Sequence, residues 1–171
     1  MIDALDIQIL TILQSDARTS NVDVARAVGL APSAVLERIR KLEERGLIKG
    51  YRAQLDAHAL GFGLMAFVYV RTEDRHGETA DLLAKLPEAQ EVHHVAGEDC
   101  YLVKVRVTDA EALGSLLRER IGAIKTVRST RTTVVLQTVK EAMALPIGEA
   151  SAGDKRTVKG RSRKRKQGGR T

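Results

Sequence analysis

Residues 4–51 read ALDIQILTILQSDARTSNVDVARAVGLAPSAVLERIRKLEERGLIKGY, and this stretch decides the fold of the first part of the chain. Apolar residues recur at helical spacing in three blocks, which begin near Ile2 and end at Leu42. Gly29 stands between the second and third blocks, where the chain needs a left-handed turn that only glycine adopts without steric cost. Pro32 follows it and suits the first position of a new helix. The pattern predicts three short helices, with a tight turn between the last two.

The last of these predicted helices, residues 32–45, has a basic outer face. A tight turn followed by an exposed basic helix is typical of a helix-turn-helix module, which reads the major groove of DNA. The candidate contacts to base edges are Ser33, Ala34 and Glu37. The candidate contacts to phosphates, which position a protein without reading sequence, are Arg38, Arg40 and Lys41. For Arg38, a structural salt bridge to Glu43 or to another neighbour is an equally good interpretation.

The second half of the chain changes to strand spacing. Apolar residues alternate over residues 64–71, and the pattern then switches between helical and strand periods up to residue 140. The expected elements after the first strand are a helix at 79–86, strands at 92–96 and 101–107, a helix at 113–121 and a long strand at 127–140. The order strand-helix-strand-strand-helix-strand is that of a ferredoxin-like split unit. The sequence therefore predicts an α+β chain, with a winged-helix-like reader followed by a ferredoxin-like domain.

In such a domain both helices cover one face of the sheet, so the other face needs a cover of its own. The residues assigned to that face are Met65, Phe67, Tyr69, Leu102, Val134 and Leu136. A monomeric protein rarely exposes an apolar patch of this kind, and two sheets paired across a twofold axis would bury it. A monomer with a patchy surface is the alternative. A dimer would also place two readers about 34 Å apart on one duplex, so we expect a pseudo-palindromic operator.

Several stretches of the chain resemble the Lrp/AsnC, or feast/famine, family of transcriptional regulators. The matching stretches are LDIQILTILQSDARTS (5–20), VLERIRKLEERGLIKGY (35–51), VAGEDCYLVKV (95–105) and TRTTVVLQTVK (130–140). The resemblance covers about residues 3–141 and implies a sequence-specific regulator of transcription that responds to an amino acid or a related metabolite. It also implies a dimer that commonly assembles further into tetramers or octamers. One departure is Ala31, where the family often has a Ser or Thr that caps the recognition helix.

In this family the small-molecule effector binds at the turn between the second and third strands, which here is residues 96–101. Gly97 permits a sharp turn whose backbone N–H groups would receive a ligand carboxylate, and Glu98 or Asp99 would hold its ammonium group. The candidate effector residues are Ala96, Gly97, Glu98 and Asp99, with Thr130 and Thr132 as weaker candidates. Cys100 stands where the commoner family form has an aspartate, so the ligand class is not carried over. A plain hairpin turn needs the same glycine and acids.

Catalytic interpretations have little support, and we expect no cofactor, no metal and no catalytic residue. Cys100 is the only cysteine, and His93 and His94 are neighbours on a predicted strand, where their rings would point to opposite faces. Two alternatives to a specific regulator stay open. One is an architectural nucleoid protein of low specificity. The other is an enzyme like the siroheme decarboxylases, which share the two-domain architecture and in which His93 or His94 would act.

The basic character of the chain is concentrated at its end. The formal charge is +6, but residues 155–171 hold nine Lys or Arg and no acid, so residues 1–154 carry −3. We divide the chain into a DNA-binding domain (1–50), a linker strand (51–61), a ferredoxin-like effector and dimerisation domain (62–141) and a disordered basic tail (142–171). The tail would add phosphate contacts or would only aid solubility. Short apolar runs and one cysteine indicate a cytoplasmic protein without a membrane segment.

Overall fold

The computed structural model describes residues 2–74 and 77–147 of the chain. They form two compact units, one made of the residues up to Ala53 together with those from Ala142 onward, and the other of Gln54–Glu141. The tail expected to be disordered spans residues 142–171, and of these residues 148–171 lie outside the described residues. No helix in the described ranges is both long enough and apolar enough to cross a membrane.

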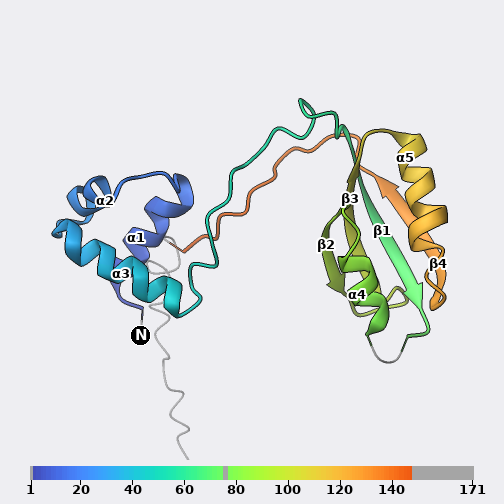
Figure 1. Ribbon diagram of the computed structural model, residues 1–171, viewed down its shortest axis with the longest axis horizontal. Helices are drawn as coiled ribbons and strands as arrows, with labels where there is room; N and C mark the ends of the chain where they lie inside the picture. Colours follow the sequence, from blue (N-terminus) through green and yellow to red (C-terminus); the bar gives the residue numbers. More distant parts are fainter. Residues whose placement is uncertain (1, 75–76, 148–171) are drawn as a thin grey trace, which may run out of the picture. The chain divides into compact units, whose positions relative to one another are not determined.

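The N-terminal unit contains the three predicted helices, which confirms the interpretation of the opening stretch (Figure 1). They are α1 (Ala4–Ser15), α2 (Asn21–Val28) and α3 (Pro32–Glu44). Their inward faces form one core, made of Ile9, Val24, Ala25, Val35, Ile39 and Leu42. Gly29 ends α2 at φ 70°, as the tight turn requires. α1 and α2 therefore hold α3 by its apolar stripe and leave its other faces exposed.

The two helix starts that matter for the site are capped differently. Asp3 caps α1: its side chain accepts from the N–H of Asp6, and the side chain of Asp6 accepts from the N–H of Asp3 in return. Ala31 precedes α3 and makes no side-chain cap, while Pro32 occupies the first turn. The departure noted at Ala31 thus leaves the start of α3 without a side-chain acceptor.

Residues 51–61 do not form the expected linker strand. They are coil and a turn, in which Phe62 donates its N–H to the carbonyl of Ala57. A strand exists only where a neighbouring strand receives its backbone hydrogen bonds, and among the described residues none lies beside this segment. The domain limits at 50, 61 and 141 stay predictions.

The second unit is the predicted ferredoxin-like arrangement. Its elements are β1 (Leu64–Thr72), α4 (Glu78–Ala84), β2 (Ala89–His94), β3 (Tyr101–Val107), α5 (Ala110–Ser115), the π-helical turn η1 (Leu116–Ile121) and β4 (Val127–Val134). The four strands are antiparallel in the order β2-β3-β1-β4, and the helices lie on one face of the sheet (Figure 1). The last strand ends at Val134 rather than at residue 140.

The register of the sheet corrects part of the face that we predicted to be open. Residues opposite each other on neighbouring strands point to the same face. Val134 is paired with Ala66, which is fully buried in the core beneath the helices, so Val134 belongs to that face. Leu136 lies beyond the end of β4 and is 97% exposed. Alternation along residues 127–140 does not show which face Val134 takes, because its register with β1 decides that, and it does not reach Leu136, because the strand ends at Val134.

Candidate functional sites

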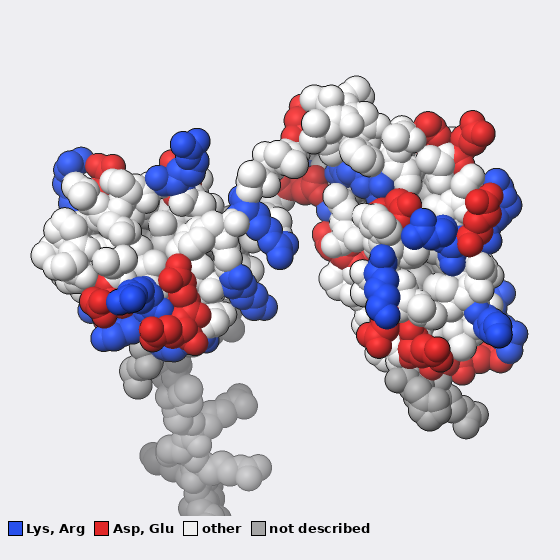
Figure 2. All heavy atoms as spheres, in the orientation of Figure 1, with Lys and Arg blue, Asp and Glu red and all other residues white. Residues whose placement is uncertain are grey.

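The candidate DNA contacts lie together on α3. Ser33, Ala34, Glu37, Arg40 and Lys41 are all exposed, and they come from the turns whose opposite side packs in the core. Glu37 and Arg40 form an exposed ion pair, with 3.4 Å between Oε1 and Nη1. In Figure 2, acidic and basic side chains are interleaved on the visible face of this unit rather than separated.

Arg38 is engaged differently from the other candidates. Its Nη1 lies 2.6 Å from Oδ1 of Asp6 and 2.7 Å from Oδ2 of Asp3, and its side chain is 30% exposed. The hydrogen bonds to Asp3 and Asp6 raise the pKa of the guanidinium. Glu43, the other partner considered for Arg38, instead accepts a hydrogen bond from the hydroxyl of Tyr51 at 3.0 Å. Arg38 thus ties α3 to the capped start of α1.

The carboxylate of Asp3 is held in its charged form by this arrangement. The hydrogen bond from the N–H of Asp6, followed by the guanidinium of Arg38, lowers the pKa of Asp3 below its ordinary value. A half-open hollow beside these groups is lined by several candidate residues of α3, among them Ala34, Glu37 and Lys41. The start of α1 therefore borders the surface that would meet DNA.

The candidate effector loop joins β2 to β3. Gly97 has φ 136°, a backbone angle that favours glycine, and Val95 donates its N–H to the carbonyl of Cys100 across the turn. Cys100 in turn donates its N–H to the carbonyl of Val70 on β1, at 3.0 Å. The loop is thus closed on itself and tied to the central strand, with the glycine at its tip.

Asp99 of this loop is paired with a residue that sequence reasoning missed. Nη2 of Arg131 lies 2.9 Å from Oδ2 of Asp99, and its guanidinium carbon stands 4.0 Å from the ring centroid of Tyr69. The hydrogen bond to Asp99 raises the pKa of Arg131. The signal was available in the stretch TRT, because the residue between two threonines on a strand points to the face opposite both.

The two threonines are therefore not brought together with Asp99. Thr130 is paired with Val70 and Thr132 with Val68, and both valines face the helices. Arg131 is paired with Tyr69 and lies on the other face with Asp99. Within one chain, the loop and the two hydroxyls form no common pocket.

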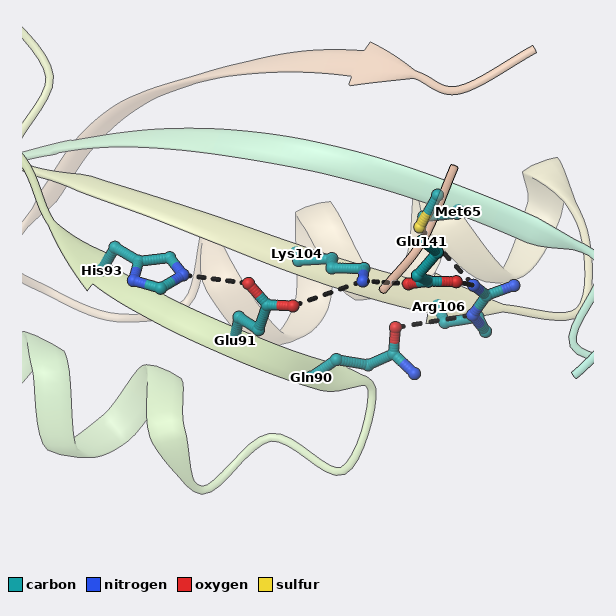
Figure 3. A network of polar contacts seen from close by, with 7 residues as sticks. All are labelled: Met65, Gln90, Glu91, His93, Lys104, Arg106 and Glu141. Atoms are coloured by element: carbon teal, nitrogen blue, oxygen red, sulfur yellow. Dashed lines mark hydrogen bonds and ion pairs between the residues drawn. The ribbon is translucent and has the colours of Figure 1, made fainter. Parts of the chain in front are cut away.

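Sequence reasoning also missed a line of charged groups across the open face of the sheet (Figure 3). Glu91 on β2 lies 3.0 Å from Nε2 of His93 and 3.3 Å from Nζ of Lys104 on β3. Lys104 and Arg106 both pair with Glu141, which comes from the segment after β4. The hydrogen bond to Glu141 raises the pKa of Lys104, and the same bond lowers the pKa of Glu141. The face predicted to be apolar thus has a polar centre.

The adjacent histidines point to opposite faces, as expected. His93 contacts Glu91 on the open face, while the ring of His94 lies 5.2 Å from that of Tyr101, which is buried beneath the helices. The described part of the chain contains no cluster of three or more His, Cys, Asp or Glu side chains placed to hold a metal ion.

Comparisons with known proteins cover both units. Residues 2–43 match the family model of the AsnC-type helix-turn-helix domain, and residues 65–145 match that of the Lrp/AsnC ligand binding domain. The HTH-type transcriptional regulator FL11 of Pyrococcus horikoshii is 40% identical over 147 residues, which span 85% of this chain and 97% of that protein. The leucine-responsive regulatory protein of Escherichia coli is 41% identical over 150 residues, with 85% and 92% covered.

Solved structures give the same result. The transcriptional regulator NMB0573 of Neisseria meningitidis, in complex with L-Met, has a TM-score of 0.83 at 29% identity and covers 88% of this chain and 99% of its own. The feast or famine regulatory protein Rv3291c of M. tuberculosis, complexed with L-methionine, has a TM-score of 0.80 at 35% identity, with 85% and 99% covered. The similarity therefore extends over both units.

Proposed function

Since the chain belongs to the Lrp/AsnC family of transcriptional regulators, we propose that it binds specific operators on double-stranded DNA through α3. The observation that supports this proposal is the exposed face of α3. Val35, Ile39 and Leu42 are buried in the core on the opposite face of the helix, so the exposed side chains are held in a fixed orientation. Ser33, Ala34 and Glu37 then face base edges, while Arg40 and Lys41 neutralise phosphates. The uncapped start of α3 offers backbone N–H groups at the positive end of the helix dipole, where a phosphate is favoured.

The test is gel retardation on fragments that the wild-type protein selects from genomic DNA. The double variant Arg40→Ala, Lys41→Ala is expected to lose retardation because two phosphate contacts are removed. The control double variant Lys85→Ala, Lys125→Ala removes the same charge from exposed positions of the sheet unit and is expected to bind normally. Unchanged retardation by the α3 variant would show that this orientation of α3 is wrong.

A second copy of the chain is the partner that we propose for the open face of the sheet. Phe67, Tyr69 and Leu102 lie there only half-buried, around the charged line through Lys104. Two such faces packed together would bury the apolar side chains and hold two copies of α3 for one operator. Assembly into tetramers or octamers follows from the family. A regulator of chromosomal genes would act in the cytoplasm.

An amino acid is the effector that we propose, with the loop around Gly97 as its site. The L-methionine complexes of two structural neighbours support this choice. In the proposed site the N–H groups beside Gly97 meet the effector carboxylate, and Asp99 meets its ammonium group once Arg131 moves aside. A thermal shift series over the twenty amino acids tests it, starting with methionine. A ligand at 100 times its Kd stabilises the protein by about 2.7 kcal/mol.

We propose no catalytic activity for the chain, in line with a family of regulators. The siroheme interpretation would need His93 or His94 at a tetrapyrrole. The side chain of His93 is engaged with Glu91, and the ring of His94 lies beside that of Tyr101. A Soret band in the purified protein, or after addition of the tetrapyrrole, would contradict the proposal.

A further inference from the structure

The open face of the sheet carries four charged side chains whose signs alternate along a line (Figure 3). Their order is Glu91, Lys104, Glu141 and Arg106, so the line reads minus, plus, minus, plus. Nζ of Lys104 lies 3.3 Å from Oε1 of Glu91, and it also forms an ion pair with Glu141. Nη2 of Arg106 lies 3.5 Å from Oε2 of Glu141. We call these four residues the four-charge line.

The groups of this line can each take a further partner from outside the chain. The side chains of Glu91 and Glu141 are 47% and 42% exposed, and a carboxylate has about four acceptor positions. Arg106 uses Nε and Nη2 for its contacts with Gln90, Met65 and Glu141. Its Nη1 therefore keeps two N–H groups for another acceptor.

Apolar side chains of β1 lie along one side of the four-charge line. Phe67 is directly opposite Lys104 in the sheet, and Met65 is opposite Arg106. When a second face covers these side chains, water is excluded from the charges beside them. Coulomb interactions are stronger in such surroundings than in water. The signs of the charges that meet across the two faces therefore become decisive.

The four-charge line is complementary to itself under twofold symmetry. A twofold axis through the middle of the line reverses its order in the second copy, which then reads plus, minus, plus, minus. Glu91 meets Arg106 of the second copy, and Lys104 meets Glu141 of the second copy. Because a twofold interface uses the same surface on both copies, each of these pairings occurs twice. Every position of the line thus faces the opposite charge.

A shift by one position along the line makes every contact unfavourable. Lys104 would then lie against Arg106 of the second copy, and Glu141 would lie against Glu141 of the second copy. Like charges brought together in an interface are strongly disfavoured. Hydrophobic contact is non-directional, so the apolar side chains alone would tolerate such a shift. The charges therefore discriminate between registers that the apolar contacts do not.

We propose that the four-charge line sets the register between two copies of the chain, with Glu91 of each copy paired with Arg106 of the other and Lys104 paired with Glu141. The inference rests on the second copy proposed for this face and names the side chains that orient it. The line contributes specificity more than affinity, because the cost of removing the ions from water offsets much of their attraction.

The test uses Glu91→Arg and Arg106→Glu, each measured alone and in an equal mixture by sedimentation velocity. Each variant alone places like charges at two contacts between its copies, so its dissociation constant is expected to rise by at least about a hundredfold. In the mixture, one copy has two arginines at these positions and the other has two glutamates. Both contacts then join opposite charges, and the mixture is expected to regain the wild-type sedimentation coefficient.

The matched control makes the same changes of charge on the other face of the sheet. Glu119→Arg and Arg118→Glu alter exposed positions of η1, which packs beneath the sheet through Leu116 and Ile121. Both control variants should keep the wild-type oligomer, alone and mixed. Circular dichroism checks that each variant is folded. If Arg106→Glu is not folded, Arg106→Gln replaces it, and its mixture with Glu91→Arg should still associate more strongly than Glu91→Arg alone.

A mixture that stays as dissociated as its two components would overturn the proposal, and so would single variants that keep the wild-type oligomer. Phe67→Asp separates this failure from failure of the proposed interface. If Phe67→Asp is monomeric and the mixture is not restored, the open face is the interface but the four-charge line does not set its register. If Phe67→Asp and both charge variants keep the oligomer, a second copy does not pack on this face.

Discussion

The guanidinium of Arg38 in α3 lies 2.6 Å from the carboxylate of Asp6 in α1, although the two residues are 32 positions apart. The carboxylate of Asp6 is almost fully buried and also accepts from the N–H of Asp3. Removing Arg38 would leave this carboxylate without its counter-charge. The ion pair therefore makes Arg38 a positioning residue for α3, whereas Lys41 remains a candidate for direct contact with phosphate.

Arg38→Ala and Lys41→Ala should consequently have opposite signatures. Arg38→Ala is expected to lower the melting temperature and to leave the salt slope of DNA affinity unchanged. Lys41→Ala is expected to reduce that slope by about 1, as for one lost phosphate contact, with little change in melting temperature. Titrations at several salt concentrations and thermal melts decide it. A reduced slope in Arg38→Ala would restore Arg38 as a phosphate contact.

The low pKa of Asp3 predicts a pH dependence of stability. The N–H of Asp6 and then Arg38 favour the charged carboxylate in the folded chain, so its folded pKa lies below its unfolded one. The resulting stabilisation is present above the ordinary aspartate pKa of about 3.9 and is lost as the pH falls through the lower folded value. Asp3→Asn keeps a capping side chain without the charge.

Urea unfolding of the wild type and Asp3→Asn at neutral and acidic pH is the measurement. The wild type should be the more stable protein at pH 7, and the difference should vanish toward about pH 2. A difference in the free energy of unfolding that stays constant over this range would contradict the role given to the carboxylate.

We expect the buried hydroxyl of Thr79 to stabilise the sheet unit. Its side chain is fully buried, and Oγ1 lies 2.7 Å from Oγ1 of Thr126 and 3.2 Å from that of Thr72. Thr79→Val keeps the shape but removes the hydroxyl that pairs with Oγ1 of Thr126, whereas Thr72 keeps its bonds to the carbonyl of Thr126 and the N–H of Asp74. The lost bond is expected to cost about 1–3 kcal/mol of unfolding free energy. Thr79→Ser keeps the hydroxyl and should cost less. Chemical denaturation measures both, and an equal or larger loss in Thr79→Ser would refute the role of the hydroxyl.

We expect Arg131 and a bound amino acid to compete for the carboxylate of Asp99 at the effector loop. The guanidinium of Arg131 forms an ion pair with the carboxylate of Asp99. Arg131→Ala should therefore free this carboxylate for the ammonium group of an amino acid. We expect the affinity for the amino acid to rise by up to about fivefold, as for an exposed ion pair. Asp99→Asn should weaken it. The control is Arg128→Ala, which changes an arginine on the same strand as Arg131 and breaks its ion pair with Glu73. Calorimetric titration with the amino acid found by thermal shift gives the affinities. Weaker binding in Arg131→Ala would instead place Arg131 in contact with the effector.

A substitution at Phe67 tests whether the open face of the sheet is the interface between two copies of the chain. Phe67 lies half-buried on the open face of the sheet, opposite Lys104 on β3. Phe67→Asp places a charge where a second copy is proposed to pack, so sedimentation should show a monomer with weakened operator binding. Leu82→Asp, at an exposed position on α4, should keep the oligomer. Retention of the oligomer in Phe67→Asp, with the folded structure checked by circular dichroism, would exclude this face as the interface.

Local pattern was sufficient for the helices and for the order of the strands. The apolar spacing of Val35, Ile39 and Leu42, and the glycine at position 29, are properties of short stretches that hold in any context. The same is true of the alternation that puts His93 and His94 on opposite faces. Pattern failed at Val134, whose face depends on the register with β1, and at Leu136, which lies beyond the end of the strand.

The partners of the charged side chains depended on packing over long distances in the chain. Asp6 is brought to Arg38, Asp99 to Arg131 and Gln14 to Leu145 only when helices and strands far apart in sequence are folded together. The sequence alone does not show whether a charged side chain contacts water, a phosphate or a carboxylate. The amino-acid order therefore determined the family, the architecture and the helix proposed to read DNA, while the folded chain decided which candidate side chains already have a partner.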